Sequence, residues 1–288
     1  MLGLITPTSG EVLIDNKATS LKNTDILFVD SEFKSIEKNY YNPSTISNVL
    51  KVVNENGDLI WDLNLGYVND NFKQVDFIVD NNNNLFVVSL GVGKGDGVYL
   101  YKISNDGSLV FEKNYNEIYN EDGGGCSIIQ LSDNNYMIGL TNLSIDGEGD
   151  FFVMKVNGEG DTIFTKNFNK YETQYLYSIF EDHNNEIVLS GFGESNSGNE
   201  YHLFRKIDLE GNNLITIEYE LDEDDYEVKI HKGILTNDNK YIFCGGLSLS
   251  NDESNSINCL KKTDSNGEIV FENNFGNFTF SGFFNLIK

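Results

Sequence analysis

The chain has 288 residues, with 45 Asp or Glu against 20 Lys or Arg, and its formal net charge at pH 7 is −25. This balance argues against nucleic acid and anionic membranes as partners, because both are bound through clustered Lys and Arg. It is compatible with solubility, with cations and with basic partners. No apolar run reaches the ~18 residues of a membrane span.

The amino terminus, MLGLITPTSG, lacks the basic start and long apolar stretch of a signal peptide. We therefore expect either an intracellular chain or one whose leader precedes this numbering. Three cysteines without a CxxC pair predict neither a disulfide scaffold nor a metal knuckle. One disulfide bridge remains open, so cysteine usage leaves the redox compartment open as well.

Residues 2–17 read LGLITPTSGEVLIDNK. They resemble the segment after the Walker A helix of ABC-transporter ATPases, roughly GLxxPTSGxVxxDG. No GxxxxGK[ST] loop precedes them and no LSGGQ-type signature follows, so nothing in the chain would hold a triphosphate. We interpret the likeness as shared strand-and-turn chemistry or a remnant of gene fusion, and expect no ATPase activity.

The rest of the chain is organised by a repeat. Five turn glycines follow one another at intervals of 50, 53, 51 and 56 residues: Gly57, Gly107, Gly160, Gly211 and Gly267. Large apolar residues stand four positions after each glycine: Trp61, Phe111, Phe164, Ile215 and Phe271. Another set stands eight positions after it: Leu65, Tyr115, Phe168, Tyr219 and Phe275. A repeat of this length indicates stacked units or propeller blades.

Each unit contains two hairpins. The first has an Asn- and Asp-rich turn, as in SIIQLSDNNYMIGL at 127–140, and these residues tolerate left-handed backbone conformations. The second carries the glycine, as in YLYKISNDGSLVFEKNY at 99–115, where a positive φ is expected. Four strands in about 50 residues predict an all-β fold, a β-propeller of four-stranded blades. A β-helix would need shorter coils, and a helical solenoid a 3.6-residue period.

The spacing leaves five or six blades open. Residues 280–288 look like the first strand of a further unit, and we expect 283–288 to pair with an amino-terminal strand, since ring closure removes exposed edges. We predict a single domain, 1–288, with units at approximately 11–66, 74–116, 126–168, 176–219 and 230–275, and with 280–288 completing an amino-terminal blade.

Two segments carry a family resemblance, KKTDSNGEIVFENNFG at 261–276 and SIIQLSDNNYMIGL at 127–140. They resemble a bacterial and archaeal propeller repeat of the type KTDxxGxxxWxxxFGG followed by DGGYIxxG. The lysine before the turn recurs at Lys102, Lys155, Lys206 and Lys262, and is shifted at Lys51. Trp is kept only at Trp61, and Asn-rich turns replace DGG. The resemblance implies a secreted, surface-attached or lipoprotein propeller, and assigns no activity.

The stretch DGEGD places three carboxylates at alternate positions, Asp146, Glu148 and Asp150, between flexible glycines. Calcium binds several oxygen ligands in such loops, so calcium is the candidate cofactor. The match to an EF-type loop fails because Phe151 stands where glycine is required. A solvated acidic loop is the competing interpretation, and it also fits LDEDD at 221–225.

Other chemistry-bearing residues have weaker patterns. The histidines show no metal-ligand spacing and fall in separate repeats: His183, His202 and His231. Cys244 is expected to be a buried apolar residue, and Cys126, after three glycines, the more reactive thiol. Arg205 is the single arginine, which opposes a sialidase that binds a substrate carboxylate. The tyrosines Tyr171, Tyr175 and Tyr177 could stack on sugars or fill space between sheets.

These observations predict a non-enzymatic binding or scaffold propeller, monomeric, with an acidic loop face for a cation, a basic partner or a glycan. The resemblance places it outside the cell or on the cell surface. The alternative is a glycan-active hydrolase or lyase that uses loop carboxylates in the central channel, since paired carboxylates perform glycoside hydrolysis.

Overall fold

The structure is a computed structural model, and it describes residues 26–33, 46–53, 59–68, 75–91, 97–115, 126–143, 149–168, 173–194, 200–220, 226–249 and 252–278. All regular elements there are strands. The first sheet contains β1 (Ile26–Phe33), β2 (Ile46–Val53) and β3 (Leu59–Val68). The second contains β4 (Val75–Val79), β5 (Leu85–Gly91), β6 (Gly97–Ile103) and β7 (Leu109–Asn114).

Three more four-stranded sheets follow along the chain. They are β8 (Cys126–Gln130), β9 (Tyr136–Leu143), β10 (Gly149–Val156) and β11 (Thr162–Phe168); β12 (Thr173–Glu181), β13 (Ile187–Glu194), β14 (Glu200–Ile207) and β15 (Asn213–Glu220); and β16 (Tyr226–Leu235), β17 (Tyr241–Leu249), β18 (Asp252–Thr263) and β19 (Ile269–Phe278). Every pairing is antiparallel and between strands consecutive in the chain.

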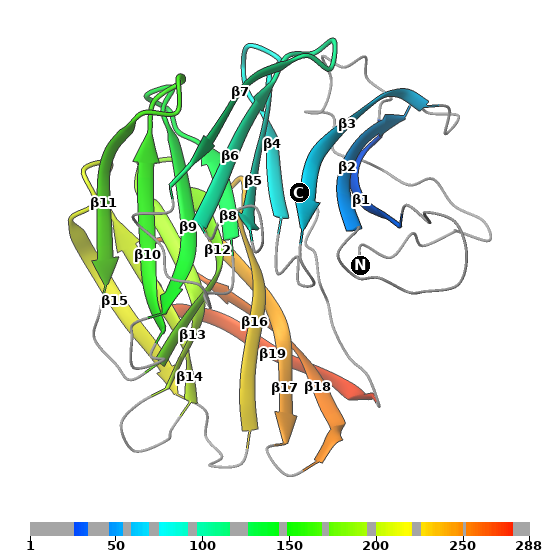
Figure 1. Cartoon of the computed structure of the whole chain (residues 1–288). Coiled ribbons are helices and arrows are strands. Elements are labelled where there is room, and N and C mark those ends of the chain that lie inside the picture. The colour runs from blue at the N-terminus through cyan, green and yellow to red at the C-terminus, as the bar shows by residue number, and fades with distance from the viewer. Residues whose placement is uncertain are drawn as a thin grey trace.

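The sheets succeed one another in chain order around an arc (Figure 1). The first strands β4, β8, β12 and β16 adjoin one another and form the inner side. The third strand β10 is buried along its whole length, whereas the fourth strands β7 and β11 are mostly exposed. The prediction of an all-β, propeller-like architecture with four-stranded sheets is therefore confirmed.

The turns adopt the backbone conformations that their residues favour. Left-handed Asn residues occur in the described first-hairpin turns: Asn83, Asn134, Asn185 and Asn239. Glycines with φ between 75° and 87° occur in the described second-hairpin turns: Gly107, Gly160, Gly211 and Gly267. In the first hairpin of the second sheet, Asp80 accepts hydrogen bonds from the backbone N–H groups of Asn82 (2.8 Å) and Asn84 (2.7 Å). A short polar side chain thus satisfies the turn backbone.

The hydrophobic core lies between neighbouring sheets. One cluster joins the second and third sheets through Phe86, Leu100 and Met154, among others. Similar clusters join the third to the fourth, the fourth to the fifth and the first to the second sheet. The second, third and fourth sheets therefore pack through both faces. Strands such as β10 and β13 are buried almost throughout, as the continuous apolar runs predict.

Contacts at the turn glycines explain the repeat spacing. A Cβ added to Gly107 would lie 2.8 Å from the Trp61 ring, and one added to Gly160 would lie 3.0 Å from the Phe111 ring. At these interfaces, and at that of Gly211 with Phe164, the aromatic four residues after one glycine packs on the glycine of the next sheet; at Gly267 the neighbour is Ile217 instead. Each turn glycine is needed twice, because it adopts a positive φ and also leaves room for that ring.

The predicted closure through residues 283–288 lies outside the described residues, and no described strand pairs with a strand of another sheet. The blade number and the division into units therefore stay predictions. Within the described ranges, no helix is long and apolar enough to cross a membrane.

Candidate functional site

Both hairpins of every four-stranded sheet turn at the same end, which we name the turn end. Three lysines at one repeat position lie there, each with Nζ 2.9 Å from a backbone carbonyl of the next sheet: Lys102 to Gly158, Lys155 to Leu209 and Lys206 to Ser265. In each case the carbonyl stands two residues before the turn glycine. We call these residues the bridging lysines. Their repeat position is a structural requirement of the interface between sheets.

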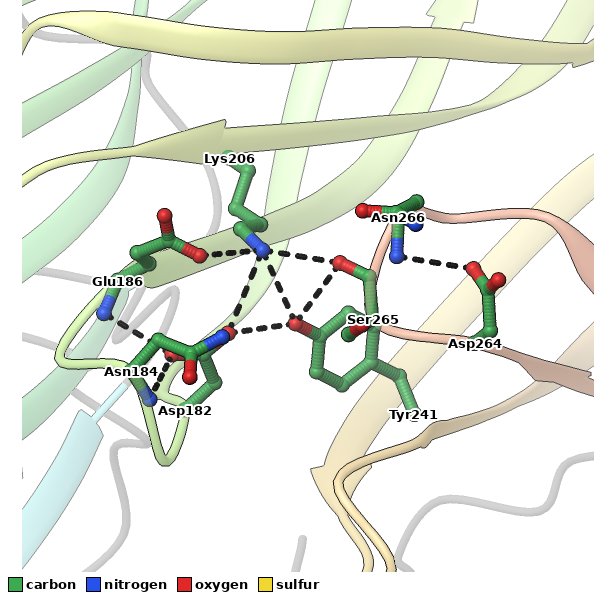
Figure 2. Close-up of polar contacts among 8 residues, drawn as sticks. All are labelled: Asp182, Asn184, Glu186, Lys206, Tyr241, Asp264, Ser265 and Asn266. Carbon is green, nitrogen blue, oxygen red and sulfur yellow. Dashed lines mark hydrogen bonds and ion pairs between the residues drawn. The ribbon is translucent and has the colours of Figure 1, made fainter.

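Lys206 is the centre of the densest of these interfaces (Figure 2). Its Nζ pairs with Glu186, and it lies 3.4 Å from Asp182 Oδ2. Tyr241 Oη donates a hydrogen bond to the same Asp182 oxygen at 2.6 Å. Lys206, Asp182 and Tyr241 are all less than 5% exposed. The group is therefore a buried network between the fourth and fifth sheets, in which two carboxylates share one lysine.

The repeat positions of Asp182 and Tyr241 are polar at one interface between sheets and apolar at the next. Tyr136 Oη donates to Asp80 Oδ2 at 2.9 Å between the second and third sheets. At the next interface both positions are apolar, because Leu131 replaces the aspartate and Ile187 replaces the tyrosine, and both belong to one core cluster. At this repeat position, an acid therefore occurs in the three described interfaces only where a tyrosine hydroxyl faces it, because a buried polar group needs a partner.

The turn end is strongly acidic. Its eight described turns contain Lys240 as their one Lys or Arg. Their twelve acidic residues are Asp80, Asp106, Asp133, Glu159, Asp161, Asp182, Glu186, Asp208, Glu210, Asp238, Asp264 and Glu268. Several of these carboxylates bond turn backbone, but their charge remains. The negative field is thus concentrated at this end as well as in the loops on which the sequence analysis placed it.

An open hollow of about 460 Å³ lies at the turn end of the inner strands β4, β8 and β12. We call it the channel hollow. Its lining residues are Ile78, Val79, Asn81, Ile129, Gln130, Leu131, Ser132, Phe180 and Glu181. The lining combines apolar side chains with a few polar ones, a composition common to ligand sites.

The polar groups of the channel hollow connect neighbouring sheets. Glu181 accepts hydrogen bonds from Ser132 N at 2.7 Å and Ser132 Oγ at 2.6 Å. Gln130 Oε1 accepts one from Asn81 N at 2.9 Å, and its Nε2 donor has no partner within the described structure. A carboxylate oxygen can accept more than one hydrogen bond, so Glu181 retains acceptor capacity and its charge. It is the single carboxylate among the lining residues.

The predicted calcium ligands are only partly visible. Asp146 and Glu148 lie outside the described residues, and Asp150 is the second residue of β10, with 3% exposure. Its Oδ2 accepts a hydrogen bond from Asn167 at 2.7 Å, and burial raises the pKa of its carboxyl. No group of three His, Cys, Asp or Glu side chains suited to a metal occurs among the described residues. The calcium site stays a prediction.

His202 is wholly enclosed between the fourth and fifth sheets. Its Nε2 lies 2.8 Å from Ser190 Oγ, and its ring stacks on Tyr219. Burial and the nearby Lys261 hold the pKa of His202 well below the ordinary imidazole value. Ser190 is also fully buried, so this Ser–His pair cannot meet a substrate and is part of the core. His183 is exposed in a turn, and the side chain of His231 lies outside the described part.

The two described cysteines are structural. Cys244 is 1% exposed, as predicted for a buried apolar residue, and burial raises the pKa of its thiol to about 11. Burial and Glu272 raise the pKa of Cys259 to about 12. The two residues oppose Leu260 and Gly245 respectively, so they point to opposite faces of the sheet and do not form a disulfide. The side chain of Cys126 is outside the described structure.

Sequence reasoning missed the channel hollow and Glu181. Glu181 and Gln130 occupy one repeat position, at the end of the first strand, where Val79 and Leu235 stand in other units. A polar residue at an otherwise apolar repeat position was the available signal. Arg205 entered the sequence analysis only as the single arginine, which opposes a sialidase. In the structure its guanidinium lies 4.7 Å from the centre of the Phe168 ring and donates a hydrogen bond to Asn213, and burial lowers its pKa.

Comparison with known proteins gives likeness in fold alone. No protein-family model matches the chain, and no curated protein is similar to it. A solved polysaccharide lyase, an ulvan lyase of family PL25, superposes with a TM-score of 0.54 at 11% identity, covering 91% of this chain and 68% of that one. The same lyase bound to -[GlcA(1-4)Rha3S]- gives equal values. A protein of unknown function from Dyadobacter fermentans has a TM-score of 0.48 at 9% identity, covering 88% and 91%.

Proposed function

We propose that this chain is a non-enzymatic binding propeller whose acidic turn end, with the channel hollow at its centre, engages a basic protein segment. The observation that carries the proposal is the charge of the described turns, which contain twelve acidic residues and one lysine. A field of one sign raises the association rate of an oppositely charged partner. The channel hollow supplies a carboxylate, Glu181, beside apolar surface suited to the stem of a Lys or Arg side chain.

The burial of the other chemically reactive side chains also supports a binding role. Ser190, His202, Lys155 and Lys206 are enclosed between sheets, and the thiols of Cys244 and Cys259 are buried. These groups stabilise a rigid body. A rigid concave surface loses little entropy when it binds, so such a scaffold favours recognition.

The test uses a short oligolysine peptide as the probe, with binding followed by fluorescence anisotropy at low and at physiological ionic strength. Glu181→Gln removes one charge from the channel hollow and keeps its acceptor. Glu210→Gln removes one charge from an exposed outer turn and is the matched control. We expect Glu181→Gln to weaken binding by about fivefold more than the control, the factor for a charge pair worth ~1 kcal/mol. Equal effects would show general charge attraction and refute the assignment to this hollow.

The competing proposal is a glycan-active hydrolase or lyase that uses loop carboxylates. The fold likeness to the ulvan lyase makes ulvan a reasonable first substrate to test. Release of new reducing ends from ulvan by the whole chain would establish the enzyme and displace the binding proposal. Within the channel hollow, the described residues supply one carboxylate, whereas glycoside hydrolysis uses two.

Three further parts of the proposal await their own measurements. We propose a monomer at the cell surface, a ring of five or six sheets closed by pairing 283–288 with an amino-terminal strand, and calcium as the ligand of Asp146, Glu148 and Asp150. Melting with calcium and with a chelator tests the calcium site, since a bound ion stabilises the folded state. Identical midpoints would remove it.

A further inference from the structure

The face of the fifth sheet directed away from the fourth has less cover than the equivalent faces of its neighbours. Phe271 is 43% exposed, whereas its repeat equivalents Phe111 and Phe164 are partly buried against the next turn glycine. Leu260 is partly exposed, although its equivalent Phe204 is fully buried.

The bridging lysine of this sheet also lacks its usual acceptor. Lys262 occupies the position of Lys102 and Lys206, which donate to the carbonyl two residues before the next turn glycine. Among the described residues, the contact of Lys262 is Asp238 of its own sheet, at 3.5 Å. In the other sheets, the equivalents of Phe271 and Lys262 contact the glycine turn of the next sheet. Both residues are present in the fifth sheet, but no described turn faces them.

The sequence of the glycine turn recurs a sixth time, in the amino-terminal segment outside the described residues. Residues 6–16 read TPTSGEVLIDN, and residues 263–273 read TDSNGEIVFEN. Thr, Gly, Glu and Asn match at four of these eleven positions, and Val12, Leu13, Ile14 and Asp15 align with similar residues. Gly10 precedes Gly57 by 47 residues, close to the other intervals. The segment that resembles an ATPase fragment is therefore explained as a repeat unit.

Chain order decides which face this copy covers. In the described interfaces, the turn of each unit packs on the unit before it: Gly107 on Trp61, Gly160 on Phe111 and Gly211 on Phe164. In a cyclic array the first copy of the turn must follow the last. The first copy is the Gly10 turn and the last is the Gly267 turn, so the Gly10 turn belongs on Phe271.

We propose that residues 4–17 dock on the uncovered face of the fifth sheet, with Gly10 against Phe271 and the carbonyl of Thr8 accepting a hydrogen bond from Lys262. Thr8 stands two residues before Gly10, as Gly158, Leu209 and Ser265 do before their glycines. The array then has six glycine turns. This inference rests on the proposed ring closure. It does not depend on the binding proposal, which concerns the turn end and the channel hollow.

The test is a double-mutant cycle on the whole chain, with thermal unfolding followed by circular dichroism. Gly10→Ala adds a Cβ at the proposed contact, and Phe271→Ala removes the ring. We expect each to lower the midpoint by about 4 °C or more, and the double variant to lose clearly less than the sum, because the sites are in contact. Gly10→Ala with Phe164→Ala is the matched control and should be additive.

Hydrogen exchange of the peptide 1–17 gives a second readout that does not depend on stability. The proposal expects protection in the wild type and loss of protection in Phe271→Ala. An unchanged midpoint in Gly10→Ala, together with no protection of the peptide 1–17 in the wild type, would overturn the proposal. Non-additive losses of midpoint for Phe271→Ala and Gly57→Ala would instead place the turn of the first sheet on this face of the fifth sheet. Protection found only in a dimer, by light scattering, would assign the face to a second copy.

Discussion

Replacing Lys206 with methionine tests how the sheets are held together. Lys206 is 3% exposed, and its Nζ pairs with Glu186, lies 3.4 Å from Asp182 and donates to Ser265 O at 2.9 Å. Methionine keeps most of the stem volume but removes the charge, so two carboxylates lose their counter-ion. Breaking a buried ion pair from one side costs about 3–5 kcal/mol. We expect Lys206→Met to lower the free energy of unfolding by that amount.

Lys102→Met is the matched control. Lys102 donates the same carbonyl bond, to Gly158 at 2.9 Å, but has no carboxylate contact among the described residues. Its loss should be about 1 kcal/mol, the value of one hydrogen bond. Urea unfolding followed by far-ultraviolet circular dichroism measures both, with a common slope as the check on two-state behaviour.

A third variant separates charge from packing. In Lys206→Met with Asp182→Asn, the buried carboxylate is neutral, so the double variant should be more stable than Lys206→Met alone. Two results would refute the reasoning: equal losses for the two lysine variants, or a double variant that loses the full sum of the single changes. Either would mean that the carboxylates reach water once the lysine is removed.

The remaining predictions concern turns, pH and thiols. Gly160→Ala should cost about 2–4 kcal/mol in urea unfolding, because its φ is +75° and a Cβ would meet a ring at 3.0 Å, whereas Gly158→Ala, with open space around it, should cost almost nothing. Because the pKa of His202 is depressed in the folded state, the unfolded chain binds the proton more tightly. The free energy of unfolding should therefore fall as the pH drops below ~6.5, by up to ~1.4 kcal/mol per pH unit. His202→Gln should flatten this slope in thermal melts across that pH range, and an unchanged slope would assign the pH dependence to another group. The thiols of Cys244 and Cys259 should resist Ellman's reagent at neutral pH until the chain unfolds, because their pKa values are raised to about 11 and 12; rapid labelling of the folded chain would contradict their burial.

The sequence by itself determined the features that depend on local backbone chemistry. A glycine such as Gly107 and an asparagine such as Asn83 fix the sign of φ in their own turns, and alternating apolar runs between them fix the strands. The repeat of Lys102, Lys155 and Lys206 was also visible, although its role was not. Local preferences recur with each unit, so one chain contains several copies of the same signal.

Only the tertiary structure decided what faces what across the sheets. Asp182 and Tyr241 are 59 residues apart, and their hydrogen bond depends on how two sheets are offset. The packing of the third sheet on the fourth likewise brings Ser132 to Glu181 at the channel hollow. Strand pairing is set within one unit by its turns, but the packing of one sheet on the next is a balance of many side-chain contacts. No single segment of the sequence contains that balance, and so the site was visible only after the sheets were assembled.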